Sequence, residues 1–170
     1  MIRLQDILTE IGDASAKAFP WKYHQSHPAA SDQDFVYTWQ GAKGQGIVTF
    51  VFTDYNEWDV AFGSVKANNQ LDFSTLTDEG AFRVMATVME IINDFLHDTY
   101  QKYIDAKELW GSTEPKRLTF STAKDRGSSE AETSKRARLY QAYIQKQLPG
   151  SHVKRTDSDT AYDTYEITLQ

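Results

Sequence analysis

The sequence contains no cysteine, so disulfide bonds, thiolate zinc sites and a cysteine nucleophile are all excluded. A lack of cysteine fits a protein of a reducing compartment. A chain of 170 residues has the length of one domain. Such a domain buries about 70% of its unfolded surface and needs no covalent cross-links to fold. The sequence therefore predicts one soluble domain of intracellular type.

Basic residues are fewer than acidic ones. The sequence has 18 Lys and Arg and 24 Asp and Glu, which gives a net charge of −6. Such a chain repels polyanions, which argues against nucleic acid or an anionic membrane as a partner. Long apolar runs are missing too. The longest candidate, Val84–Leu96, is interrupted by polar residues and falls short of the roughly 20 residues of a membrane helix. No secretory signal is expected, because Met1–Ile11 has no continuous apolar stretch.

The hydrophobic pattern changes from strand-like to helical about halfway along the chain. Pro20 and Pro28 predict that residues 17–30 are irregular. Helices between strands predict a parallel crossover in an otherwise antiparallel sheet. We expect an α+β, mixed α/β domain over residues 13–170, preceded by residues 1–12 as an amphipathic helix or leader. The patterns predict strands at 35–39, 47–53, 58–62, 117–121, 152–156 and 162–169, and helices at 4–11, 81–95 and 129–148.

Segments of the second half, taken in order, carry a family resemblance. They are Glu57–Val65, Gly80–Leu96, Arg117–Ser121, Arg138–Tyr140 and Tyr162–Leu169. Their order resembles the core of the GNAT acetyltransferase superfamily, in which a central strand leads through a phosphate-binding turn into a long helix. The resemblance implies a GNAT-like central, mostly antiparallel sheet with the long helix and a C-terminal helix packed on it.

The turn before the long helix is where the resemblance places a cofactor. In the family, the diphosphate of coenzyme A binds free N–H groups at this helix N-terminus. Here, however, Asp78 and Glu79 would place two carboxylates beside the phosphates, which is repulsive. We therefore expect no cofactor, with acetyl-CoA as the alternative. The cofactor-binding residues that the resemblance implies are Gly80, Ala81, Phe82 and Arg83.

Candidate catalytic residues also come from the resemblance. Tyr140 matches the tyrosine that acts as general acid toward the departing thiolate in many GNAT enzymes. Asp59 or Glu57, on the central strand, would be the general base. Each residue has a structural alternative. Tyr140 lies on the apolar face of its helix and fits the core, Glu57 fits a solvated turn, and Asp59 fits a solvent-exposed strand position.

The second half also resembles a domain of unknown function that is common in tailed-phage genomes. The residues that carry this resemblance are Gly80–Val88, Leu118–Ser121 and Ser134–Tyr140. That family has no activity that can be carried over to this chain. The resemblance implies a phage protein, located in the virion or in the host cytoplasm.

Residues 1–10 resemble the capsid-targeting leader of internal head proteins in contractile-tailed phages. Those leaders are amphipathic and end in an apolar-spacer-Glu site that the head-maturation protease cuts, a pattern that Leu8-Thr9-Glu10 fits. The resemblance implies processing after Glu10 and phage head or other virion proteins as partners. The alternative is an ordinary helix, with Leu4, Ile7 and Leu8 packed on the domain.

Metal chemistry has little support, because His24 and His27 are three residues apart with no third histidine nearby in the sequence. Two hypotheses remain. The first is a phage-encoded, non-catalytic GNAT-like domain in a binding or virion-associated role. The second is an acetyl-CoA-dependent N-acyltransferase with Tyr140 as acid and Asp59 or Glu57 as base.

Overall fold

The structure is a computed structural model of the chain. The predictions for residues 1–12, Glu10, Gly80 and 129–134 fall outside the residues that it describes. They therefore stay predictions. The described residues are 16–25, 27–30, 35–42, 44–54, 56–72, 81–99, 115–123, 135–159 and 161–170.

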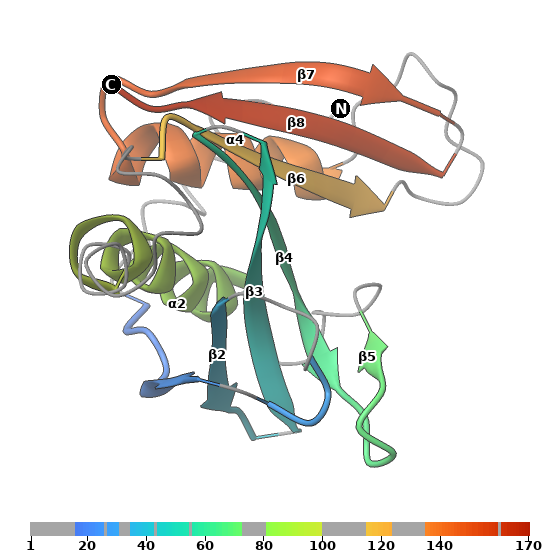
Figure 1. Cartoon of the computed structure of the whole chain (residues 1–170). Helices are drawn as coiled ribbons and strands as arrows, with labels where there is room; N and C mark the ends of the chain where they lie inside the picture. Colours follow the sequence, from blue (N-terminus) through green and yellow to red (C-terminus); the bar gives the residue numbers. More distant parts are fainter. Residues whose placement is uncertain are drawn as a thin grey trace.

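A mixed sheet of eight strands forms the centre of the described structure (Figure 1). The strands pair in the order β1-β2-β3-β4-β6-β8-β7, and β5 pairs with β4 off this path. Their bounds are β1 Trp21–His24, β2 Phe35–Gln40, β3 Gln45–Asp54, β4 Glu57–Val65, β5 Leu71–Asp72, β6 Arg117–Ala123, β7 His152–Ser158 and β8 Tyr162–Thr168.

One neighbouring pair in the sheet is parallel, and the others are antiparallel. β4 and β6 run in the same direction. Parallel strands need a long crossover, and α2, Ala81–Asp94, lies between these two strands in the sequence. The predicted parallel crossover within an antiparallel sheet is therefore confirmed.

Both described α-helices contribute to the same hydrophobic core. In Figure 1, α2 lies beside the β2–β4 half of the sheet, and α4, Lys135–Gln147, lies beside the β6–β8 half. Trp58, Leu118 and Tyr165 on the strands and Ile91 on α2 are fully buried in this core. Neither helix in the described part of the chain is long and apolar enough to cross a membrane.

A short π-helix, η1 (Phe95–Thr99), continues α2. Asp94, the last residue of α2, accepts hydrogen bonds from the hydroxyls of Tyr37 (3.1 Å) and Thr99 (2.6 Å). Burial raises the pKa of Tyr37, so its hydroxyl stays protonated and donates to the carboxylate. This contact fixes the end of the helix against β2.

The prediction that residues 17–30 are irregular is wrong for Trp21–His24, which form the edge strand β1 and pair with β2. This strand is held by contacts with distant residues. The Phe19 N–H donates to Thr87 Oγ1 (2.9 Å), and Trp21 Nε1 donates to Glu90 Oε2 (3.2 Å), both on α2. A local reading of the prolines could not detect these contacts.

Candidate functional site

The two parallel strands separate shortly after they meet. β4 and β6 pair only at Glu57–Asp59 and Arg117–Thr119. The next partner on this edge of β4 is β5, which pairs at Ser64 and Val65. Beyond this pairing, β4 at Val60–Gly63 and β6 at Phe120–Ala123 have edges that face each other. No strand among the described residues pairs with these two facing edges. We call the space between these two edges the wedge.

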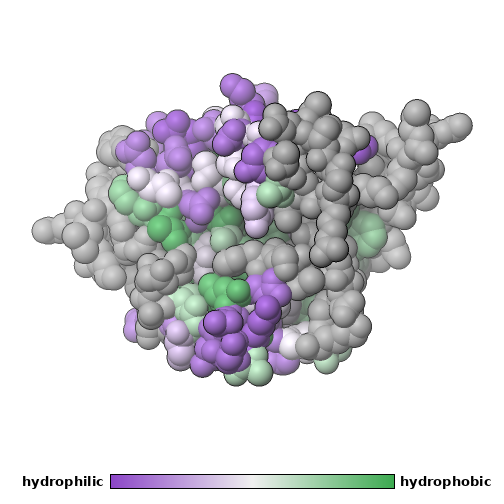
Figure 2. All heavy atoms as spheres, turned by 90° about the vertical axis from the view of Figure 1, so that its right-hand side faces the viewer, coloured by the Kyte–Doolittle hydropathy of each residue, from purple (hydrophilic) through white to green (hydrophobic). Residues whose placement is uncertain are grey.

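The floor of the wedge is aromatic. Tyr140, on α4, packs edge-on against Phe62 of β4 (centroids 5.1 Å apart) and against Phe120 of β6 (6.3 Å). The cavity left below has a volume of about 20 Å³ and an apolar lining that includes Met85 and Ile144. From the side where the strands diverge, hydrophobic residues are visible between two hydrophilic areas (Figure 2).

Tyr140 itself is only 4% exposed. The alternative that places it in the core is therefore confirmed. Its partners Phe62 and Phe120 were not predicted as site residues. Their alternation with small or polar neighbours predicts only that they face the core. Phe62 and Phe120 lie on two strands that diverge. This placement depends on the pairing of strands far apart in the sequence, which local alternation does not predict.

The two candidate bases lie on the other face of the sheet from Tyr140, because successive strand residues point to opposite faces. Asp59 accepts a hydrogen bond from Thr119 Oγ1 (2.9 Å). Glu57 pairs with Arg117 at 3.2 Å. The Glu57 side chain is 22% exposed and that of Arg117 is 42% exposed, so Glu57 is a paired strand residue and not a solvated turn residue. Asp59 is half-buried, so the fully exposed alternative is wrong for it.

The candidate acid and the candidate bases are therefore not brought together. A general acid and a general base must both reach the reacting group within hydrogen-bond distance, directly or through one water. Here the backbone of β4 separates the Tyr140 side from the Asp59 side. Both carboxylates are also occupied by partners of their own, Asp59 by the Thr119 hydroxyl and Glu57 by the Arg117 guanidinium.

The beginning of α2 is also engaged within the protein. The Arg83 guanidinium stacks over the Phe19 ring at 3.9 Å, and its Nε donates to the Lys17 carbonyl (2.9 Å). The Phe82 carbonyl accepts a hydrogen bond from the Tyr143 hydroxyl (3.5 Å), and burial raises the pKa of Tyr143. Ala81 begins the helix. Arg83 thus has partners that compete with a phosphate.

His24 and His27 do come close, with ring centroids 5.2 Å apart. His24 Nε2 is 2.6 Å from Thr38 Oγ1, and His27 Nδ1 accepts the Ala29 N–H. In the described part of the chain, no group of three or more His, Asp or Glu residues is placed to hold a metal ion. Burial lowers the pKa of His24, and the positive charges of His27 and Lys22 lower it further.

This shift predicts a pH-dependent stability. The pKa of His24 is lowered from its ordinary value of 6.5. Between the lowered pKa and 6.5, the unfolded chain therefore binds a proton that the folded chain does not bind. The free energy of unfolding should fall as the pH drops below 6.5 and level off below the lowered pKa of His24. Urea denaturation from about pH 8 to about pH 5 measures this slope.

The variant His24→Gln should have a smaller slope in this range, whereas His152→Gln, on an exposed strand position, serves as the control. Equal slopes for the parent and His24→Gln would contradict the assignment to His24.

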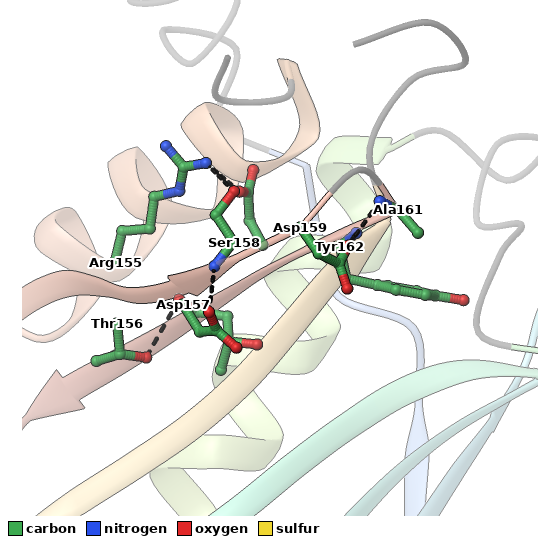
Figure 3. Close-up of polar contacts among 9 residues, drawn as sticks. Arg155, Thr156, Asp157, Ser158, Asp159, Ala161 and Tyr162 are labelled. Carbon is green, nitrogen blue, oxygen red and sulfur yellow. Dashed lines mark hydrogen bonds and ion pairs between the residues drawn. The ribbon is translucent and has the colours of Figure 1, made fainter. Parts of the chain in front are cut away.

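The far edge of the sheet holds a buried ion pair. Arg155 on β7 contacts Asp163 on β8 at 2.7 Å, and Asp163 is 0% exposed. Arg155 also donates to Ser158 Oγ, as Figure 3 shows. In the turn between the strands, the Asp159 carboxylate accepts the N–H groups of two following residues. The predicted closing strands are confirmed, and β7 continues beyond the predicted residue 156 to Ser158.

Comparison with known proteins gives one distant similarity. No protein-family model matches the chain, and no curated protein matches it. Among solved structures, the chain is similar to an acetyltransferase from Bacillus subtilis in complex with CoA. The TM-score is 0.41 at 11% sequence identity, over 83% of this chain and 80% of that one.

Proposed function

We propose that the chain is a GNAT-like binding domain that holds an extended, amide-bearing chain in the wedge and does not transfer acyl groups. The facing edges at Val60–Gly63 and Phe120–Ala123, which no described strand pairs with, carry this proposal. Backbone N–H and C=O groups at an open strand edge bind an extended ligand as an added strand. Ala61 and Phe62 are partly exposed and Ser121 is exposed, whereas Val60, Gly63, Phe120 and Thr122 are buried. A ligand would therefore reach the wedge at Ala61, Phe62 and Ser121.

The ligand class follows from the chemistry of the wedge. An amide-bearing chain satisfies backbone donors and acceptors, while an apolar portion packs on Phe62 above the aromatic floor. Pantetheine, the amide-bearing arm of coenzyme A, and an extended peptide both have this chemistry. The diphosphate of coenzyme A would gain little from Arg83, which is held by Phe19 and Lys17.

The separation of Tyr140 from Asp59 and Glu57 across the sheet supports a non-catalytic role. A general acid or base contributes typically 10²–10⁴-fold to a rate, and only when it reaches the reacting atoms. Acyl transfer from acetyl-CoA to a primary amine should therefore not exceed the uncatalysed rate. Release of free thiol from acetyl-CoA, measured with a chromogenic disulfide, checks this expectation.

Binding is tested by calorimetry and thermal shift with pantetheine and with coenzyme A. Because a ligand that binds the native state stabilises it, pantetheine at about 1 mM should raise the melting temperature. Coenzyme A should bind no more tightly than pantetheine. The variant Phe62→Trp, which overfills the wedge, should weaken binding at least about tenfold. Phe52→Trp, at a partly buried position of β3, is the matched control.

Several outcomes would reject the proposal. Thiol release that is lost in Tyr140→Phe and in Asp59→Asn would establish the alternative, an acetyl-CoA-dependent N-acyltransferase. Coenzyme A that binds far more tightly than pantetheine would show that the start of α2 holds the diphosphate. No binding of pantetheine or of extended peptides would remove the wedge as a site.

We also propose, from residues 1–10, that the chain is carried in the virion of a tailed phage as an internal head protein. The support is the leader-like pattern ending in Leu8-Thr9-Glu10. Mass spectrometry of purified particles should find the chain with a new N-terminus at Ile11. Absence of the chain from the particles would contradict this role and would leave the binding proposal for the wedge unaffected.

A further inference from the structure

A second concave feature lies at the opposite end of the parallel strands from the wedge. We call it the helix-end cleft. It has a volume of about 620 Å³, within the usual range for small-ligand sites. Leu96 and His97 of η1, Gln147 at the end of α4, and Leu169 after β8 contribute to its walls. Pro115, just before β6, also lines it, which places the cleft beside the paired ends of β4 and β6.

The polar groups of this cleft favour a positive charge. The C-terminal end of a helix carries partial negative charge on carbonyls without helical donors, and α4 ends here. Pro149, which lines the cleft, has no N–H and cannot donate to a carbonyl of the last turn of α4. Amide side chains of Asn93, Gln147 and Gln170 add further oxygen acceptors.

No described residue that lines the cleft is Lys or Arg, so none of them brings a permanent positive charge to these acceptors. His97 is the titratable group among the described lining residues, and its Nδ1 lies 2.9 Å from the carbonyl of Asn93. Lys146 is exposed in the last turn of α4 but does not line the cleft. The net charge of −6 also attracts cations from a distance.

The remaining walls are apolar. Leu96, Leu148 and Leu169 form a surface on which a chain of methylene groups can pack, as the stem of a lysine side chain does. The Ser151 hydroxyl is buried beside them and, among the described residues, has no hydrogen-bond partner. The cleft thus combines carbonyl and amide oxygens with an apolar wall.

From this combination we infer that the helix-end cleft binds an alkylammonium group. The ammonium donates hydrogen bonds to the amide and carbonyl oxygens, and the aliphatic stem packs on the leucines. A lysine side chain of another protein and a free diamine share this chemistry. The inference does not depend on the proposed function, because the wedge and the cleft lie at opposite ends of β4 and β6.

The test uses the folded full chain and small probes. Nα-acetyl-lysine methylamide and 1,5-diaminopentane carry the ammonium, and Nα-acetyl-norleucine methylamide carries a similar stem without charge. Each is titrated to about 10 mM while backbone NMR shifts are recorded. We expect saturable shifts at Leu96, Gln147 and Leu169 with at least one ammonium probe, and binding of the norleucine compound at least about tenfold weaker.

Two exposed glutamines of α4 provide a matched pair of variants. Gln147→Lys places a tethered ammonium at the cleft and should weaken binding of the probe at least about tenfold. Gln145→Lys adds the same charge to the same helix at a position whose side chain does not line the cleft, and binding should be unchanged. Thermal melting of both variants shows whether each is folded.

Binding of the lysine probe alone would identify a protein side chain as the source of the ammonium, and binding of the diamine alone would identify a free amine. The inference is overturned if the norleucine compound binds as tightly as the charged probes, if both variants lose binding equally, or if no ammonium probe binds at about 10 mM.

Discussion

Replacing Arg155 by methionine is expected to lower the free energy of unfolding by about 3–5 kcal/mol, because it leaves a buried carboxylate without its cation. Asp163 is 0% exposed and lies 2.7 Å from Arg155, whose side chain is 27% exposed. Water cannot replace the lost partner at a fully buried carboxylate. Urea denaturation followed by circular dichroism measures the loss.

A second Arg–carboxylate pair of the same sheet is the control. Arg117 pairs with Glu57 at 3.2 Å, but its side chain is 42% exposed. Because solvent screens such pairs, Arg117→Met should cost only about 0–1 kcal/mol. An equal loss of unfolding free energy in Arg155→Met and Arg117→Met would show that burial does not decide the cost of losing the arginine.

The double variant Arg155→Met/Asp163→Leu completes a mutant cycle. Replacing both partners of a buried pair by apolar residues is often neutral, so the double variant should recover most of the stability that Arg155→Met loses. If the double variant lost as much stability as Arg155→Met and Asp163→Leu lose together, the two side chains would not be coupled and the interpretation would be wrong.

The largest loss from an apolar residue is expected at Phe95. Its ring stacks on Phe50 with centroids 4.0 Å apart and meets the edges of Phe35 (5.2 Å) and Trp58 (5.3 Å). Phe95 is 0% exposed, so Phe95→Ala leaves a cavity among rigid rings that cannot close around it. The free energy of unfolding should fall by about 3–5 kcal/mol, measured by urea denaturation.

Phe82→Ala is the control for Phe95→Ala. Phe82 lies near the start of α2, which η1 continues at Phe95. Phe82 is only partly buried, so less apolar surface is lost and the decrease in stability should be smaller. A loss at Phe82 as large as that at Phe95 would mean that the aromatic cluster around Phe95 is not the centre of the core.

Local patterns predicted most of the elements, because each pattern reports which face of an element is buried. The alternation of Trp58, Val60 and Phe62 predicted β4, and the helical stripe from Ala81 to Phe95 predicted α2. The edge strands β1 and β5 were missed. Both are short, and pairing with β2 and β4 holds them in place more than their own sequence does.

Glycine shows the same limit at Gly46. Together with Gly41 and Gly44 it forms a glycine-rich pattern that by itself predicts a turn. The turn exists, with the Gly41 N–H donating to the Gly44 carbonyl (2.8 Å), but Gly46 lies within β3. A Cβ at Gly46 would overlap the indole ring of Trp39, its partner on β2. Packing against the Trp39 side chain on the neighbouring strand, and not the turn, requires a glycine at position 46.

The sequence by itself determined most of the elements, their buried faces and the parallel crossover, because periodicity and element order depend on neighbouring residues. It also placed Tyr140 on the apolar side of α4. The tertiary structure alone decided how far β4 and β6 stay paired, that Asp59 and Tyr140 lie on opposite faces, and that Arg155 meets Asp163. These features depend on the register of strands far apart in the chain, which no local pattern specifies.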